Sequence, residues 1–350
     1  MTDGIVKRFR PVARQAAITA GLELAAILSR FGVGKEAAGD GLIFTLHHVR
    51  PAAQLPFQPN RHLDVTPGFL DAVLVALREL GYDFVSLEAA GERLMAPPTG
   101  RRFACFTLDD GFRDNAVHAS PVFAAHGAPY TIFVSKGLSE GSHSAWWETL
   151  AALLQKTDHI QFDFGGGLEN LPTATTAQKM VAFERLSNFV GDEAEAAAVT
   201  AIDALAARHD VDALGVCRDL VMTRAELQAL ADDPLVSYGA HTVSHRGLAR
   251  LDDAEAEAEV ANSAAYVAEI TGRPCRTFAY PYGDARSVSA REAERLKRHG
   301  LIGVTTRPGT LRAGGTADLQ ALPRVSLNGL YQKARYVRAL ASGLPFRMMG

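Results

Sequence analysis

Short apolar runs that alternate with helix-type segments are the feature of this sequence that most constrains its fold. The runs have the length and residue types of β-strands and cover residues 42–46, 83–86, 103–108, 130–134, 235–238, 277–280, 301–305 and 324–327. Strands that alternate with helices in this way predict βα units around a parallel sheet. Because there are seven or eight strand candidates, a closed or nearly closed (β/α) barrel is favoured over an open sheet.

Two of the helical segments have well-defined ends. Thr66 is a cap residue in front of a proline, an apolar stripe follows, and Gly81 ends it. The segment 252–270 begins with acidic residues and is followed by Gly272, as the helix dipole and a glycine stop favour. We therefore expect a helix at each of these places.

One region, about 140–230, differs in composition from the rest of the chain. It is rich in Ala and Glu and has few β-branched runs, so we expect a helical insertion. The predicted organisation is an N-terminal helical segment (1–39), an α/β barrel (40–330) that contains the insertion, and a C-terminal helical tail (331–350).

Composition and charge exclude several classes of protein. The content of 47% hydrophobic and 21% charged residues does not fit a disordered or fibrous chain. A formal charge of −3 offers no basic field for nucleic acid, so we expect no nucleic-acid partner. Three widely separated cysteines predict neither a disulfide framework nor a thiolate metal site, and a reducing compartment fits them best.

The N-terminal region combines the basic stretch Lys7-Arg8-Phe9-Arg10 with an apolar run over 16–28 that Glu23 interrupts. This run lacks the cleavage site of a secretory peptide and is too short to span a bilayer. We expect an amphipathic helix packed on the domain, with an interfacial membrane helix as the alternative. The expected location is the cytoplasm, at the inner membrane face if this helix docks there.

Unusual polar residues follow four of the predicted strands. They are His47-His48 after 42–46, Asp109-Asp110-Gly111 after 103–108, His241 and His245 after 235–238, and Tyr280-Pro281-Tyr282-Gly283 at the end of 277–280. In a parallel barrel the C-terminal ends of the strands meet at one mouth, where chemistry is located. We therefore expect these residues to converge.

The residue types in this set are those of a catalytic metal site. Two adjacent carboxylates in a strand-to-turn peptide face different directions, so one can bind a metal while the other approaches the metal-bound water. Histidines four apart can face one metal if a helix or turn begins there. One aspartate and two histidines leave coordination positions open, unlike a structural site. Each motif alone also fits a simpler role: Asp-Asp-Gly and Tyr-Pro-Tyr-Gly as turns, and His47 as a core histidine.

With these motifs in this order, the sequence resembles the polysaccharide deacetylase family, the NodB-homology domain of carbohydrate esterase family 4. Residues 107–111 (T-L-D-D-G) resemble the first motif, T-F-D-D-G, with Leu in place of Phe. Residues 241–245 (H-T-V-S-H) match the second motif, H-[ST]-x-x-H, and residues 278–283 (F-A-Y-P-Y-G) resemble the third. The resemblance covers about 40–330 without the insertion and implies a distorted (β/α)7-type barrel.

The resemblance also implies roles for individual residues. Asp109 would be the general base, and the backbone N–H of Tyr282 would donate to the oxyanion. The metal ligands would be Asp110, His241 and His245. Zinc suits this set best, with nickel, cobalt or manganese as alternatives. The implied activity is hydrolytic removal of N-acetyl groups from an amino-sugar glycan.

The sequence departs from the family pattern at two positions. The C-terminal motif usually supplies a histidine acid, but residues 322–329 (L-P-R-V-S-L-N-G) contain none. Residues 46–49 (L-H-H-V) resemble a Y-H-R-V segment found in a subset of these enzymes, so we predict His47 as the acid. Ala279 stands where many members have an arginine that orients the base, and Arg324 is the predicted substitute.

The insertion separates the first two motifs, because His241 lies 132 positions after Asp109. Trp146 and Trp147 stand at its beginning, where they would either stack on sugar rings or anchor the inserted helices. We expect a cap beside the mouth that selects the substrate.

Three functions fit these observations. The leading one is an N-deacetylase that acts on an amino sugar in an oligosaccharide, polysaccharide or lipid-linked glycan. The second is a non-catalytic glycan-binding or assembly protein that retains the metal site. The third is a deacylase of another substrate, such as an acetyl ester, a peptide-like amide or a cyclic imide. Whether His47 lies within reach of the metal site discriminates the first from the second.

Overall fold

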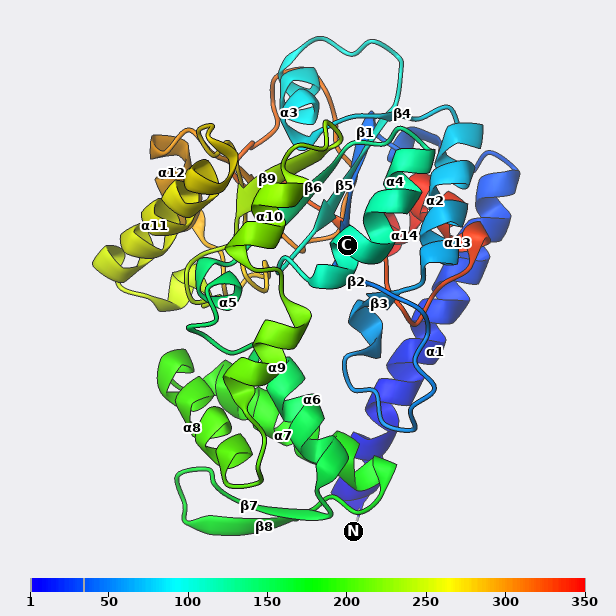
Figure 1. Ribbon diagram of the computed structural model, residues 1–350. Helices are drawn as coiled ribbons and strands as arrows, with labels where there is room; N and C mark the ends of the chain where they lie inside the picture. Colours follow the sequence, from blue (N-terminus) through cyan, green and yellow to red (C-terminus); the bar gives the residue numbers. More distant parts are fainter. Residues whose placement is uncertain (1, 34, 350) are drawn as a thin grey trace.

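A parallel β-sheet lies at the centre of the molecule, with helices packed around it (Figure 1). The computed structural model describes residues 2–33 and 35–349, and the side chains of 14–29, 31–33 and 36–348. The strands of this sheet are β1 (Gly41–Leu46), β4 (Asp83–Phe84), β5 (Phe103–Leu108), β6 (Tyr130–Val134), β9 (Val236–Ala240), β10 (Thr277–Ala279), β11 (Ile302–Val304) and β12 (Val325–Ser326). Each of them falls on one of the runs that the sequence predicts.

The order of the strands is β11-β10-β9-β6-β5-β1-β12, with β4 paired to the start of β5. All of these pairs are parallel. An isolated parallel bridge joins Val304 at the end of β11 to Leu322, three residues before β12. The two edges of the sheet therefore approach each other, and the predicted distorted barrel is confirmed.

Helices cover the outside of the sheet and its ends. They are α1 (Thr2–Arg30), α2 (Pro67–Glu79), α3 (Leu87–Met95), α4 (Ser120–Ala125), α5 (Lys136–Ser139), α11 (Asp253–Thr271), α12 (Ala290–Arg298), α13 (Ala334–Ala341) and α14 (Leu344–Met349). Short elements are the 3-10 turns η1 (Lys35–Ala37), η2 (Arg61–Leu63) and η4 (Leu248–Arg250), the π-helical turn η3 (Asn115–Ala119), and the strand pair β2 (His48–Val49) and β3 (Asp64–Val65).

Both helices whose ends the sequence predicts are present, as α2 and α11. The hydroxyl of Thr66 accepts a hydrogen bond from the Phe69 N–H and caps α2. The carboxylate of Asp252 caps α11 in the same way, and Gly272 ends that helix in the left-handed conformation, with φ of 67°.

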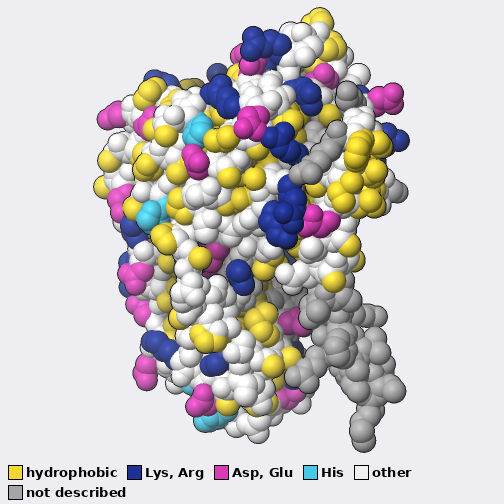
Figure 2. Space-filling view, turned by 90° about the vertical axis from the view of Figure 1, so that its right-hand side faces the viewer, with side chains coloured by type: hydrophobic (Ala, Val, Ile, Leu, Met, Phe, Trp, Pro, Cys, Tyr) yellow, Lys and Arg dark blue, Asp and Glu magenta, His cyan; other side chains and the backbone are white. Residues whose placement is uncertain are grey.

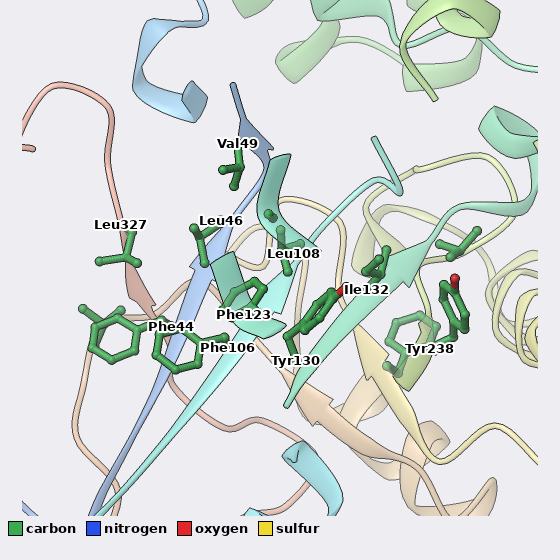
Figure 3. Packing of buried hydrophobic residues seen from close by; sticks show 14 of the residues in the cluster. Phe44, Leu46, Val49, Phe106, Leu108, Phe123, Tyr130, Ile132, Tyr238 and Leu327 are labelled. Carbon is green, nitrogen blue, oxygen red and sulfur yellow. The ribbon is translucent and has the colours of Figure 1, made fainter. Parts of the chain in front are cut away.

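The core consists of apolar side chains on both faces of the sheet. On the outer face, the rings of Phe44 and Phe106 stack with centroids 5.5 Å apart, and Phe123 stacks on Tyr130 at 4.4 Å (Figure 3). Alternate strand residues, such as Ile43, Cys105 and Phe133, belong to a separate buried cluster. Because β1, β5 and β6 are buried at every position, their sequences are mostly apolar rather than alternating, with one buried threonine in each.

The insertion forms a subdomain with its own apolar core, seen below the barrel in Figure 1. It contains the helices α6 (Trp146–Lys156), α7 (Thr176–Asp192), α8 (Glu195–Ala207) and α9 (Ala213–Leu220), together with the antiparallel strands β7 (His159–Asp163) and β8 (Leu168–Pro172). The last helix of the insertion, α10 (Arg224–Leu230), packs instead against the barrel core through Leu227. The sequence predicts a helical insertion, and the structure adds a β-hairpin to its helices. The hairpin forms because Ile160 and Phe162 alternate with exposed residues and a run of glycines, 165–167, makes the turn.

Helix α1 lies along the C-terminal helices α13 and α14, with Ala25, Ala26 and Ala339 in their shared contact. Glu23, which interrupts the apolar run, accepts hydrogen bonds from Arg335 and Tyr336 of α13. Figure 2 shows this face, where Lys and Arg side chains gather beside hydrophobic ones.

Other apolar side chains near this end of the chain, among them Leu24, Ile27 and Phe31, are exposed. The side chains of the predicted basic stretch Lys7–Arg10 lie outside the described residues. Within the described part of the chain, no helix is long and apolar enough to cross a membrane. Contact of α1 with a membrane surface stays a prediction.

Candidate active site

Asp109 and Asp110 follow directly after β5, and the backbone turns sharply there. Asp110 has a φ of 73° and Gly111 a φ of 68°, so two successive residues adopt the left-handed conformation. As a result, the two carboxylates face different groups, although both are buried. Adjacent aspartates at a strand end are expected to diverge in this way.

Asp109 is held by a bidentate ion pair with Arg324. The two terminal nitrogens of the guanidinium donate to the two carboxylate oxygens, each at 2.7 Å. Arg324 is fully buried and also donates to the Thr107 hydroxyl and the Thr305 carbonyl. Burial raises the pKa of Asp109, but the charge and hydrogen bonds of Arg324 outweigh burial and leave that pKa below its usual value. Asp109 is therefore ionised and fixed in orientation.

Asp110, His241 and His245 form a buried cluster with the donor set of a metal site. Their potential ligand atoms lie within 4.8 Å of one another, and Oδ1 of Asp110 is 3.4 Å from Nε2 of His241 and 3.2 Å from Nε2 of His245. Among the described residues, this buried oxygen has no hydrogen-bond partner, so a cation would compensate it. Nδ1 of His241 bonds to the Ala279 carbonyl at 2.7 Å, which leaves Nε2 free to act as a ligand.

A strained turn brings the side chains of His241 and His245 together. No helix begins at His241. Thr242 and His245 have φ values of 61° and 57°. The carboxylate of Glu259 in α11 accepts hydrogen bonds from the backbone N–H groups of Val243 and Ser244 and supports this turn. Left-handed non-glycine residues cost about 1–3 kcal/mol each and concentrate at functional sites. In the described chain, only one of the five such residues, Asp210, lies outside the three motifs.

Tyr282 in the third motif also has a left-handed backbone, with φ of 61°. Its carbonyl accepts a hydrogen bond of 2.6 Å from the Thr306 hydroxyl. Among the described residues, its N–H has no hydrogen-bond acceptor. The backbone N–H that the resemblance predicts as oxyanion donor is therefore available to a ligand.

Gly283 is required for this turn, so substituting it with alanine should damage the site. Gly283 has a φ of 65°, and an added Cβ would lie 2.5 Å from the backbone nitrogen of Thr306. We expect Gly283→Ala to cost about 1–3 kcal/mol in the free energy of unfolding and to lower activity. Gly166→Ala is the control, since its Cβ would meet nothing within 4 Å. Equal melting temperatures and activities for both variants would contradict this account of the turn.

His47 and His48 lie in different surroundings, although they are adjacent in sequence. Nε2 of His47 is 4.0 Å from Oδ2 of Asp109, and its side chain keeps 24% exposure. Burial lowers the pKa of His47, and the negative charges of Asp110 and Asp109 oppose this only in part. His48 is fully buried, stacks on Phe112 and bonds to Asp114. Of the two histidines, His47 is therefore the one that reaches the site.

All of the predicted site residues except the buried Arg324 line one cavity of about 220 Å³. It is lined by His47, Asn60, His62, Leu63, Asp109, Asp110, Trp146, Trp147, Phe183, His241, His245, Tyr282 and Thr306. Sequence reasoning missed Asn60, His62, Leu63, Phe183 and Thr306. They lie on loops or on the insertion, where no periodic pattern marks them.

The two tryptophans at the start of the insertion have different environments. Trp147 is buried, and its ring centroid lies 4.7 Å from that of His245, so it anchors the insertion against the site. Trp146 is partly exposed, and its Nε1 donates to the Tyr282 hydroxyl at 3.1 Å. Both rings line the cavity, and stacking on a sugar ring stays a prediction.

Residues 192–301 match the family model for polysaccharide deacetylase, a stretch that contains the second and third motifs. No curated protein matches the sequence. The structure is similar to the Streptococcus pyogenes deacetylase PplD in complex with acetate, with a TM-score of 0.51, 17% identity, and 83% of this chain and 92% of that chain covered. It is also similar to IcaB from Ammonifex degensii, with a TM-score of 0.50, 17% identity, and coverage of 86% and 97%.

A third similar structure is the putative polysaccharide deacetylase BA0330 from Bacillus anthracis, with a TM-score of 0.52, 17% identity, and coverage of 87% of this chain and 68% of that chain. At these identities the likeness establishes a shared fold. The first motif, residues 107–111, lies outside the matched stretch, and the insertion separates it from the other two. Together, the matched stretch, the order of the three motifs and the shared fold support the resemblance to the polysaccharide deacetylase family that the sequence indicates.

Proposed function

We propose that this protein hydrolyses the acetamide group of an N-acetylated amino sugar within a glycan. The observation that carries the proposal is the arrangement around Asp109. An ionised carboxylate, fixed by Arg324, adjoins the Asp110-His241-His245 cluster in one cavity. Such a cavity offers a base, a place for a divalent cation and room for a small amide.

Each part has a task in amide hydrolysis. A divalent cation held by Asp110, His241 and His245 would polarise the acetamide carbonyl and acidify a bound water. Asp109 accepts the proton of the attacking water, since Arg324 holds it ionised and oriented. The N–H of Tyr282 donates to the oxygen on which negative charge develops.

His47 is the group that protonates the departing amine. An amine is a poor leaving group and needs a proton as the C–N bond breaks. His47 lies at the edge of the cavity, 4.0 Å from the carboxylate that takes up the proton of water. A histidine in this position supports the catalytic function, whereas a site with no acid nearby would have favoured the glycan-binding alternative.

A second cavity supports a substrate longer than one sugar. It measures about 610 Å³, lies between the insertion and the barrel, and shares Trp146, Trp147 and His245 with the catalytic cavity. Ser144 and Asp203, which bond to each other at 2.8 Å, also line it. Aromatic faces beside hydroxyl and carboxylate groups suit sugar rings and their hydroxyl groups.

The proposal is tested by acetate release from N-acetylglucosamine and its oligomers of increasing length. We expect the metal-loaded protein to release acetate and to act faster on oligomers than on the monosaccharide. Acetate release from acetyl esters alone would favour a deacylase of another class. Binding of oligomers without any acetate release would favour the non-catalytic alternative.

The acid is tested by His47→Gln. We expect a decrease of about 10²–10⁴-fold in turnover of the amide, because the amine leaves without a proton. An aryl acetate carries a leaving group that needs no proton, so its hydrolysis should decrease far less. His159→Gln, on an exposed position of β7, is the matched control. Equal losses on amide and aryl ester would exclude His47 as the acid.

A further inference from the structure

We infer that Glu195 of the insertion is a positioning residue that holds Tyr282, and so the oxyanion-donating turn, in its catalytic conformation. This inference rests on the proposed function, because it assigns a task to a residue outside the three motifs. It makes the insertion part of the catalytic machinery as well as a cap.

The first contact that supports this role is with the Tyr282 side chain. The Tyr282 hydroxyl donates to Oε1 of Glu195 at 2.6 Å and accepts from Nε1 of Trp146 at 3.1 Å. Burial and the Glu195 carboxylate raise the pKa of Tyr282 well above its usual value, so the hydroxyl keeps its proton and donates. Two elements of the insertion, α6 and α8, therefore hold the tip of this side chain.

The other oxygen of Glu195 contacts the loop of the second motif. Oε2 accepts a hydrogen bond of 3.1 Å from the N–H of Gly247, two residues after His245. It also lies 3.6 Å from a guanidinium nitrogen of Arg250. One buried carboxylate thus joins the turn that carries Tyr282 to the loop that carries His245.

A carboxylate is suited to this place for a chemical reason. Its two oxygens accept from Tyr282 and Gly247 at once, and its charge faces Arg250. A glutamine would keep one acceptor but present an amide N–H₂ to the other donor. Its neutral side chain would also leave Arg250 without its partner in this network.

Tyr282 needs such support because its backbone is strained. The left-handed φ of 61° is unfavourable for a residue with a Cβ and persists only where the surroundings enforce it. The Thr306 hydroxyl holds the Tyr282 carbonyl on one side, and Glu195 with Trp146 holds the ring on the other. Loss of the second support would let the N–H of Tyr282 move away from the reacting carbonyl.

The test is a double-mutant cycle between Glu195→Gln and Tyr282→Phe, measured on an N-acetylglucosamine oligomer. We expect each single variant to lower kcat about 10- to 100-fold with KM unchanged, since a small misplacement of an oxyanion donor acts on the transition state. Because Glu195 acts through the Tyr282 hydroxyl, the double variant should be no slower than the slower single variant. Glu193→Gln, an exposed glutamate two residues away, is the control and should retain wild-type kcat.

Additive losses of kcat, or an unchanged kcat in Glu195→Gln, would overturn the inference while leaving the proposed function intact. If the wild-type protein releases no acetate, the same cycle is measured by thermal unfolding. The coupling would then be supported if Tm decreases less in the double variant than the sum of the two single decreases. A decrease equal to that sum would refute it. Failure of the proposed function is thus distinguishable from failure of this inference.

Discussion

Replacing Asp109 with asparagine should decrease acetate release by about 10²–10⁴-fold, because an amide cannot accept the proton of water. The side chain keeps its size, so binding of the glycan should change little and the loss should appear in kcat. Initial rates on an N-acetylated oligomer, together with glycan affinity measured by calorimetry, check both statements. Activity within tenfold of wild type would show that another group is the base.

Asp109→Asn should also destabilise the protein. A control must therefore separate the loss of stability from the loss of the base. Arg324 is fully buried, and Asp109 is the carboxylate that accepts from both of its terminal nitrogens. Leaving a buried charge without its partner costs about 3–5 kcal/mol. Arg324→Met in the Asp109→Asn background removes that charge and should recover much of the melting temperature without recovering activity. A double variant that regains activity would contradict the role of base.

The second large effect is expected at the metal cluster. Chelation, or His241→Ala, should remove the bound divalent cation and abolish measurable acetate release, since only two protein ligands would remain in the variant. Adding zinc, cobalt, nickel or manganese should restore the chelated wild type and leave His241→Ala inactive. Metal content by mass spectrometry and acetate release check this expectation, with His159→Ala on β7 as the control.

Metal binding should also be visible without any substrate. A cation that binds only the folded state at a concentration of 100 times its Kd adds about 2.7 kcal/mol to the free energy of unfolding. The melting temperature of the wild type should therefore increase on addition of the metal, and that of His241→Ala should not. Full activity after complete chelation, or a stoichiometric metal in the variant, would exclude the proposed ligand set.

Local features of the chain could be predicted from the sequence alone. The strands follow from short apolar runs, and the ends of α2 and α11 follow from Thr66, Asp252 and Gly272, because caps and glycine stops act within one helical turn. Strand ends in a parallel barrel meet at one mouth, so the sequence also predicted that Asp109 and Arg324, 215 positions apart, would approach each other.

Other features depend on distances that no local pattern encodes. Neighbouring residues at the end of β1 point in different directions, but only the structure places His47 at the cavity and His48 against Phe112. The hairpin of the insertion depends on packing within its own small core, which overrides the helical composition of the surrounding region.

By itself, the sequence determined the strand-helix order, the three motifs and their meeting at one mouth, because periodicity, capping and strand ends are local properties. Only the tertiary structure decided that Glu195 and Trp146 reach Tyr282 and that Trp147 is buried against His245. These relations arise where the insertion packs against the barrel, and side-chain contacts between segments distant in sequence are set by that packing alone.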